Sequence, residues 1–375
     1  MDVKLIILSY LPFTTLRTMM YLSKECYALI NKLKYKADDI YLISDRRISE
    51  NGFGDIVIRV IIVWKRPRVK SCTYMSPDTY ELSFTDRSEG GCFVMQEEGT
   101  LDGSKSKQGV HYSDVNKYFP SVRVFLRFAR SFKCKAITIY MDSKAEEIAR
   151  AVREEPVTTK FSCELLRIYT NDPAMVILFS RFLQPGCGLA VNDNISVFPM
   201  FLEDSETFLG KDFFNLNQIY KLQSLTTGEM TEINDEQVVQ LRCHTLRIGG
   251  RFITSSGINR IIKQWFEGCR DISHILLFGV QAVVEDEVFH GFEKQALSRE
   301  QLFEIEDSED RWRSYDNHPR GYYGLWNSSG TMLVVICGER YCSLIKGDPG
   351  SYRYSPLLWG YSILPPVVDY GSGVQ

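Results

Sequence analysis

Cysteine and histidine are the residues of this sequence with the widest chemistry, and their spacing limits what they can do together. The ten cysteines stand singly, and none belongs to the Cys-x2-Cys pairs that build structural zinc sites. Cys243-His244, and Cys269 with His274, come nearest to a set of metal ligands. Both lie on or beside expected strands, where such residues usually pack in the core. We therefore expect no metal site.

One short stretch, Gly186-Cys187-Gly188, is superficially similar to a nucleophile turn. It stands where a helix is expected to end and a strand to begin, and a C-capping glycine beside a buried thiol is the common arrangement there. The sequence contains neither a Walker-type phosphate loop nor Gly-x-Gly-x-x-Gly. We expect no catalytic residue and no cofactor, so the chain is predicted not to be an enzyme. A hydrolase built on Cys187 is the remaining enzymatic alternative.

Overall charge and hydropathy exclude several classes of partner. A formal net charge of -3 and a pI near 6.1 provide no field that would gather nucleic acid or an anionic membrane. Arg123, Arg127 and Arg130 form a basic stripe on an expected helix, but no aromatic residues for base stacking alternate with them. No stretch reaches the ~20 apolar residues of a membrane span. We expect neither nucleic acid nor a membrane as a partner.

The cysteines and the first residues also predict a compartment. Scattered single cysteines in a chain of 375 residues are typical of buried free thiols in a reducing compartment. The apolar run at 5–8 is followed by Ser9, Pro12 and Arg17 without a small-residue cleavage site, so we expect no signal peptide. The chain is therefore predicted to be cytoplasmic or nuclear.

The first third of the chain divides into a helical and a strand-rich part. Residues 1–36 are expected to form three short helices, because Pro12 and Ser23 separate apolar runs at helical spacing. Residues 40–115 show β-branched alternation between clusters of Gly, Pro, Asp and Ser. The stretch 97–109, with several glycines and no apolar periodicity, is expected to be a loop.

Helices and strands alternate over residues 120–346. A helix over 121–133 precedes a strand over 136–140, and Asp172 followed by Pro173 is typical of a helix start. Asn234 is expected to cap a further helix. The next helix is expected to open at Ser255 or Ser256 and to end at Gly268.

The spacing of these strands suggests a repeat. The strand at 137–139 is followed 29 residues later by 166–168, and 246–248 is followed 29 residues later by 275–277. A strand-helix unit of this length is the period of leucine-rich-repeat-type solenoids, while an ordinary βαβ domain is the alternative. We favour the repeat array, because the strands are short and lack a Gly-rich phosphate turn.

The sequence thus predicts an α+β fold. A short three-helix module occupies 1–36, and an irregular strand-helix domain resembling leucine-rich repeats occupies 40–346. Within that domain, 40–115 is β-rich, 120–346 carries the repeat-like units, and a small β-rich segment ends it. Residues 347–375 are expected to form an irregular tail.

Two sets of residues resemble one known family. The first is similar to the F-box pattern, in which a helix ending Ile-Leu-x-x-Leu is followed by a hydrophobic-Ser-Lys turn; it comprises Ile7-Leu-Ser-Tyr-Leu-Pro12, Leu16, Leu22-Ser-Lys24, Cys26 and Leu29-Ile30. The second resembles the type-2 F-box-associated domain of the large nematode F-box family; it comprises Leu246-Arg-Ile248, Ser255 to Gly268, Gly321 to Trp326, Ser329 to Val335 and Tyr341 to Leu344. The resemblance covers roughly 1–36 and 120–346.

This resemblance implies a function. In the family, the F-box helices pack against a Skp-type adaptor bound to a cullin scaffold, and the associated domain is thought to choose the protein substrate. The expected function is therefore substrate recognition in a cullin-based ubiquitin ligase, and a non-catalytic binding scaffold with a vestigial F-box is the alternative. The Leu-Pro pair that usually opens an F-box would fall just before Met1, which implies a shortened docking surface. The implied docking residues are Leu8, Leu11, Pro12, Leu16, Leu22 and Ser23.

Overall fold

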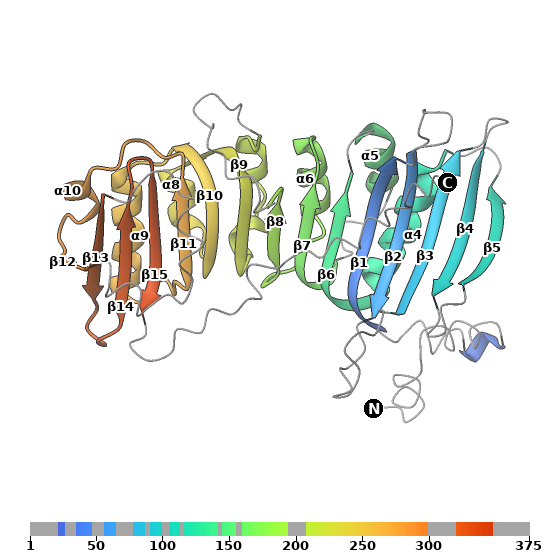
Figure 1. Cartoon of the computed structure of the whole chain (residues 1–375), viewed down its shortest axis with the longest axis horizontal. Helices are drawn as coiled ribbons and strands as arrows, with labels where there is room; N and C mark the ends of the chain where they lie inside the picture. Colours follow the sequence, from blue (N-terminus) through green and yellow to red (C-terminus); the bar gives the residue numbers. More distant parts are fainter. Residues whose placement is uncertain are drawn as a thin grey trace, which may run out of the picture.

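The computed structural model describes residues 22–26, 35–46, 56–64, 78–86, 91–99, 105–112, 116–141, 145–154, 160–193, 208–298 and 320–347. Their strands form one mixed sheet of fifteen strands, drawn across the whole width of Figure 1. From left to right in that view the strand order is β12-β13-β14-β15-β11-β10-β9-β8-β7-β6-β1-β2-β3-β4-β5.

The middle of the sheet is parallel. Six strands lie side by side in chain order, and each is parallel to the next. They are β6 (Phe132–Tyr140), β7 (Ser162–Tyr169), β8 (Gly188–Val191), β9 (Ser224–Asn234), β10 (Thr245–Phe252) and β11 (His274–Phe278). On the other side of β6 lies β1 (Tyr35–Arg46), also parallel to it. Parallel neighbours need a crossover connection, and helices supply most of these.

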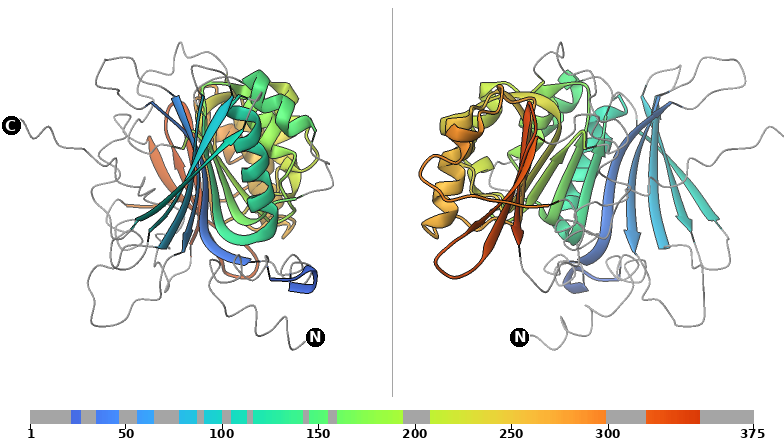
Figure 2. Two further views of the ribbon diagram at one scale, coloured as in Figure 1. Left: turned by 90° about the vertical axis from the view of Figure 1, so that its right-hand side faces the viewer. Right: turned by 60° about the vertical axis from the view of Figure 1, so that its left-hand side comes forward.

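The helices lie against one face of the sheet, as Figure 2 shows when the sheet is seen nearly edge-on. They are α4 (Tyr118–Ser131), α5 (Ala145–Arg153), α6 (Pro173–Ser180), α7 (Lys211–Phe214), the 3-10 turn η1 (Ile219–Lys221), α8 (Asp235–Gln240), α9 (Ser255–Phe266) and α10 (Glu285–Val288). Their apolar sides and the facing strand residues form one continuous core.

Alternation along the strands determines which residues reach that core. In β7, Leu166 and Ile168 are buried in it while Arg167 between them points the other way, and β10 repeats the pattern with Arg247 between two core residues. Successive side chains of a strand face opposite sides of the sheet, so apolar residues at every second position give one helix-covered face.

Antiparallel strands extend the sheet at both ends. At the right-hand end of Figure 1, β2 (Ile56–Trp64), β3 (Asp78–Asp86), β4 (Cys92–Gly99) and β5 (Lys105–Tyr112) continue outward from β1 as a meander. At the left-hand end, β11 is followed by β15 (Tyr341–Gly347), β14 (Met332–Cys337), β13 (Gly321–Trp326) and β12 (Gln295–Ala296).

A second, smaller apolar cluster lies on the face opposite the helices. It consists of Leu276, Val334, Ile336, Tyr341 and Ile345, from three neighbouring strands at the left-hand end of the sheet. Ile275 and Leu277, which flank Leu276 in β11, belong to the main core instead. The two clusters are therefore separated by the sheet itself.

The predicted fold class is wrong. A three-helix module followed by a leucine-rich-repeat-like domain is not what the chain forms, because strands dominate and join in one mixed sheet that already begins with β1 at Tyr35. Most of the predicted helical module lies outside the described residues. The 29-residue spacing misled because any strand-helix crossover between adjacent parallel strands has a similar length. Among the described residues, no helix is long and apolar enough to cross a membrane.

Local sequence signals predicted single helices and strands better than they predicted the whole fold. Asp172 accepts a hydrogen bond from the N–H of Ala174 at the start of α6, with Pro173 in the first turn, and Asn234 forms a capping box at α8, so both predicted helix starts are confirmed. The predicted loop at 97–109 is wrong, because most of it belongs to the paired strands β4 and β5. The predicted helix start at Ser255 is confirmed, and the N-cap of α9 is the preceding residue, Thr254.

Candidate functional site

Two of the six predicted adaptor-docking residues, Leu22 and Ser23, lie in the described part of the chain. The Oγ atom of Ser23 accepts a hydrogen bond from the backbone N–H of Cys26 at 3.0 Å, and residues 24–26 are helical. This is the geometry of an N-cap, in which a side-chain oxygen satisfies an N–H group that the first helical turn leaves unpaired. The other predicted docking residues, Leu8, Leu11, Pro12 and Leu16, lie outside the described residues.

The side chain of Leu22 is turned toward solvent. It is 70% exposed, while the other exposed large apolar side chains of the described residues, Phe252, Val284 and Trp326, are 48%, 47% and 43% exposed. Its neighbours Ser23, Lys24 and Glu25 are also exposed. An exposed leucine beside a capped helical turn can be buried only by another surface, and burial of a leucine contributes about 1.5–3 kcal/mol.

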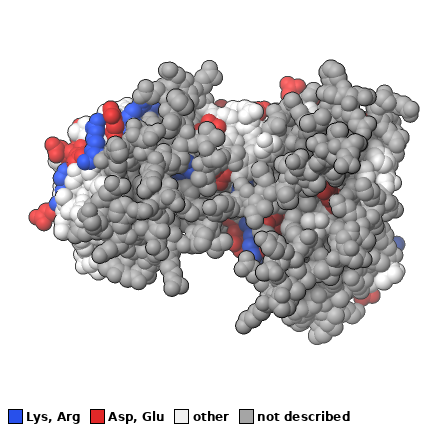
Figure 3. All heavy atoms as spheres, in the orientation of Figure 1, with Lys and Arg blue, Asp and Glu red and all other residues white. Residues whose placement is uncertain are grey.

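Phe252 ends β10, and Val284 lies in the connection that follows β11. The N–H of Gln281 donates to the carbonyl of Ile253 at 3.0 Å, and the N–H of Val284 donates to Ser255 Oγ at 2.9 Å, so the two connections are joined. This explains why Ser255, predicted to open α9, does not cap it. In Figure 3, acidic and basic side chains lie close together at this end of the molecule, so the visible surface there carries both signs of charge.

Cys187, the enzymatic alternative of the sequence, lies in the core. It is 2% exposed, its thiol donates to the carbonyl of Gly188 at 3.2 Å, and its sulfur lies 3.7 Å from that of Cys163. A hydrogen bond with Cys187, followed by burial, raises the pKa of Cys163. A catalytic cysteine needs an adjacent base, and among the described residues neither of these two thiols has a base as its hydrogen-bond partner.

A hollow of about 320 Å³ opens beside these cysteines, at the amino ends of β6 and β7. Its lining includes Lys133, Cys134, Cys163, Glu164 and Gln184. Burial raises the pKa of Cys134 to about 12, with a smaller contribution from Asp39. Protonated thiols, one cation and one anion do not form a charged subsite, and ligands of α/β sheets usually bind at the opposite, carboxyl ends of the strands.

Cys243-His244, and Cys269 with His274, are the residues that came nearest to a set of metal ligands in the sequence, where no metal site is predicted. The backbones of His244 and His274 are joined by a hydrogen bond of 3.1 Å, yet their side chains diverge. His244 Nδ1 lies 3.5 Å from Asp271, and His274 Nε2 lies 3.3 Å from Ser343 Oγ. Within the described stretches, no group of three or more His, Cys, Asp or Glu side chains is arranged to hold a metal ion.

The contact between His274 and Ser343 has the residue types of a catalytic pair. Burial, with the nearby Arg247 as a smaller cause, lowers the pKa of His274 to about 4, so its ring is neutral at pH 7. Ser343 is 1% exposed, however, and it lies between the apolar residues of the smaller cluster. A serine that no substrate carbonyl can approach does not act as a nucleophile, so the pair is a partly buried polar contact.

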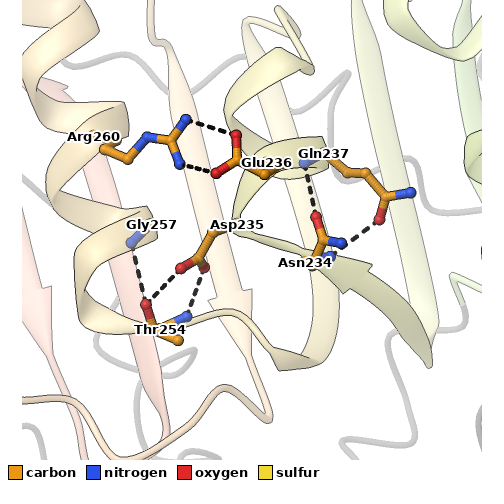
Figure 4. A network of polar contacts seen from close by, with 7 residues as sticks. All are labelled: Asn234, Asp235, Glu236, Gln237, Thr254, Gly257 and Arg260. Carbon is orange, nitrogen blue, oxygen red and sulfur yellow. Dashed lines mark hydrogen bonds and ion pairs between the residues drawn. The ribbon is translucent and has the colours of Figure 1, made fainter.

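A polar network fixes the starts of α8 and α9, and Figure 4 shows it from close by. Asp235 accepts hydrogen bonds from the N–H of Thr254 at 2.8 Å and from its hydroxyl at 2.6 Å. Thr254 Oγ1 in turn accepts from the N–H of Gly257, where an added Cβ atom would meet Asp235 Oδ1 at 2.2 Å. Farther out, Glu236 forms a bidentate ion pair with Arg260 at 2.6 and 3.0 Å. Both carboxylates have their hydrogen-bond partners inside the network, which supports a structural role.

Comparison with known proteins identifies no relative: no protein-family model matches the chain, and no curated protein or solved structure matches it. Two features of the site region were not predicted from the sequence. Thr254 was overlooked because two serines follow it, and the thiol pair of Cys163 and Cys187 was overlooked because 24 residues separate them. A signal for the thiols existed, since the strands expected at 166–168 and 189–191 are 23 residues apart, close to the separation of the two cysteines.

Proposed function

We propose that the chain is a non-catalytic substrate-recognition subunit of a cullin-based ubiquitin-protein ligase, linking a Skp-type adaptor to a target protein. The observation that carries the proposal is the conformation at Leu22 and Ser23. These are the two described residues that the F-box pattern assigns to docking, and there a 70% exposed leucine directly precedes a serine-capped helical turn. Such an arrangement supports a surface completed by a partner.

The remainder of the fold is consistent with a binding subunit. One continuous core links the helices to strands along the sheet, which supports a packed scaffold on which a target-binding surface can be displayed. Rigid elements hold a binding surface with less loss of conformational entropy on association than mobile loops do. In sequence, β1 is the first described strand after Leu22 and Ser23, and it lies inside the sheet rather than at its edge.

Binding of a purified Skp-type adaptor to the full-length chain tests the proposal. Leu22→Asp is expected to weaken adaptor binding at least about tenfold, because losing the burial of one leucine, about 1.5–3 kcal/mol, corresponds to that factor or more. Val284→Asp is the matched control, since Val284 is also an exposed apolar residue but lies in the connection after β11. Val284→Asp is expected to bind the adaptor like the wild-type chain.

The proposal is abandoned if the wild-type chain retains no adaptor under conditions in which a known F-box protein does. Equal binding by Leu22→Asp and wild type would remove Leu22 from the docking surface. The vestigial alternative predicts a different pattern, in which a target protein co-purifies with the chain and its turnover does not change when the chain is removed.

A further inference from the structure

Two pairs of buried cysteines lie side by side in the described part of the chain, and one of them borders a hollow. The sulfurs of Cys163 and Cys187 are 3.7 Å apart, and these residues are 4% and 2% exposed. Cys337 and Cys342 lie directly opposite each other in β14 and β15, their thiols are hydrogen-bonded, and both are 0% exposed. The second pair therefore provides an internal comparison for the first.

The first pair has an opening to solvent. Cys163 lines the hollow of about 320 Å³ at the amino ends of β6 and β7, together with Cys134, Ser162 and Gly186. Cys187 immediately follows Gly186 and is not among the residues that line the hollow. A small molecule in the hollow would thus meet Cys163 before it met Cys187.

We propose that Cys163 and Cys187 form an oxidation site, at which a low-molecular-weight disulfide entering the hollow converts the two thiols into an intramolecular disulfide. The new bond would join β7 to the turn that immediately precedes β8. The site is independent of the proposed adaptor function, and it is tested without an adaptor.

The geometry of the pair favours this bond. A disulfide has an S–S length of about 2.05 Å, so the two sulfurs need to approach by roughly 1.7 Å, a movement within reach of side-chain rotation. The thiol hydrogen of Cys187 is directed at the carbonyl of Gly188. Either thiol can be the donor in the contact between the two sulfurs, and loss of the Cys163 proton leaves a sulfur that already lies 3.7 Å from that of Cys187.

The reaction takes place in two displacements. The Cys163 thiolate attacks one sulfur of the small disulfide, whose S–S bond breaks, and the first small thiol leaves with the proton that Cys163 released. Cys187 then loses its proton and attacks the Cys163 sulfur of the mixed disulfide, which releases the second small thiol. Two protein thiols are oxidised, and one small disulfide is reduced to two thiols.

The rate of the first displacement depends on the thiolate fraction of Cys163. Because the pKa of Cys163 is raised, this fraction is small at neutral pH and increases about tenfold for each pH unit. The site is thus expected to respond to sustained rather than brief oxidation, and to react faster in alkaline buffer.

Incubation of the full-length protein in buffers of graded oxidised and reduced glutathione tests the proposal, with thiol trapping and non-reducing peptide mapping by mass spectrometry. Wild-type protein is expected to yield a linked pair of peptides containing Cys163 and Cys187. Cys337 and Cys342 are expected to oxidise at least about tenfold more slowly, and circular dichroism verifies that the protein stays folded. The rate at Cys163 and Cys187 is expected to rise about tenfold per pH unit.

Variants identify the order of attack. Cys187→Ser is expected to accumulate a mixed disulfide on Cys163, while Cys342→Ser, the matched control, is expected to form the Cys163–Cys187 bond like the wild type. Should Cys187→Ser fail to fold, Cys163→Ser makes the same test, since Cys187 is then expected to stay reduced. Oxidation of both pairs at one rate, or modification confined to Cys26 and Cys269, would overturn the proposal.

Discussion

The two faces of the sheet differ in kind, and neighbouring residues of β11 show how. Leu277 belongs to the core between sheet and helices, whereas Leu276 belongs to the cluster of five buried residues on the other face. Strands of parallel sheets usually read as continuous apolar runs, because helices cover both of their faces. Here arginine or threonine alternates with core residues in β6, β7 and β10, as Thr138, Arg167 and Arg247 show. Alternation in a parallel strand thus indicates that helices cover a single face.

The largest expected loss of stability comes from a cavity on the helix-covered face. Leu277→Ala is expected to lower the free energy of unfolding by about 4 kcal/mol, because a cavity between two packed layers collapses only in part. Leu276→Ala, one residue earlier and on the opposite face, is expected to cost about 2 kcal/mol, since its cluster is smaller and can adjust. Urea unfolding of both variants provides the comparison. Equal losses would show that the two faces are packed alike.

A smaller loss of stability is expected when the pH is lowered, and it is caused by a residue on the face opposite the helices. Burial lowers the pKa of His274 from 6.5 to about 4 in the folded chain. The unfolded state therefore binds more protons between pH 6.5 and 4, so the free energy of unfolding falls as the pH is lowered through that window. The loss is on the order of 3 kcal/mol, and above pH 6.5 this residue has no effect.

Unfolding measured from pH 7 to pH 4 checks this expectation. His274→Gln is expected to flatten the pH dependence in that window, because the substituted amide does not titrate. His244→Gln is the control, since His244 lies near Asp271 at the surface and its replacement leaves His274 in place. A wild-type profile that is as flat as that of His274→Gln would contradict the assignment.

The smallest of the three losses of stability concerns the polar network at the starts of α8 and α9. Asp235→Ala is expected to cost about 2 kcal/mol, because it removes two hydrogen bonds to Thr254 in a partly buried place. Glu236→Ala removes only the exposed ion pair with Arg260 and is expected to change thermal stability little, since solvent screens such pairs. A larger loss of stability from Glu236→Ala than from Asp235→Ala would contradict this expectation.

Local patterns predicted most of the elements. The predicted fold class was wrong because it depends on the pairing of strands that are far apart in the sequence. Caps such as Asp172 and Asn234 act within a few residues, so the sequence alone reveals them. The pairing of β1 with β6 joins Tyr35 to Phe132, and no local pattern encodes a contact across such a distance. The β4–β5 hairpin was missed because polar residues and glycine at 105–109 lack the apolar alternation by which strands are recognised.

The candidate site was predicted in part. Leu22 and Ser23 came from a family pattern, and their exposure and capping are details that a pattern does not contain. The rejection of Cys187 as a nucleophile relied on its expected burial, and the structure confirms that burial. Its contact with Cys163 depends on the register of adjacent strands, which the spacing of 24 residues alone does not determine.

The position of β1 affects how the chain folds during synthesis. On one side β1 pairs with β2, which follows it closely, but its other neighbour is β6, which ends at Tyr140. About ninety residues must therefore be translated before that edge of β1 finds its partner, which at about 5–20 residues per second takes roughly 5–20 s. During this interval β1 presents an unpaired edge to other nascent chains, a common origin of aggregation. After β6 forms, each new strand through β11 joins the one made just before it, so the rest of the parallel sheet assembles from neighbouring contacts.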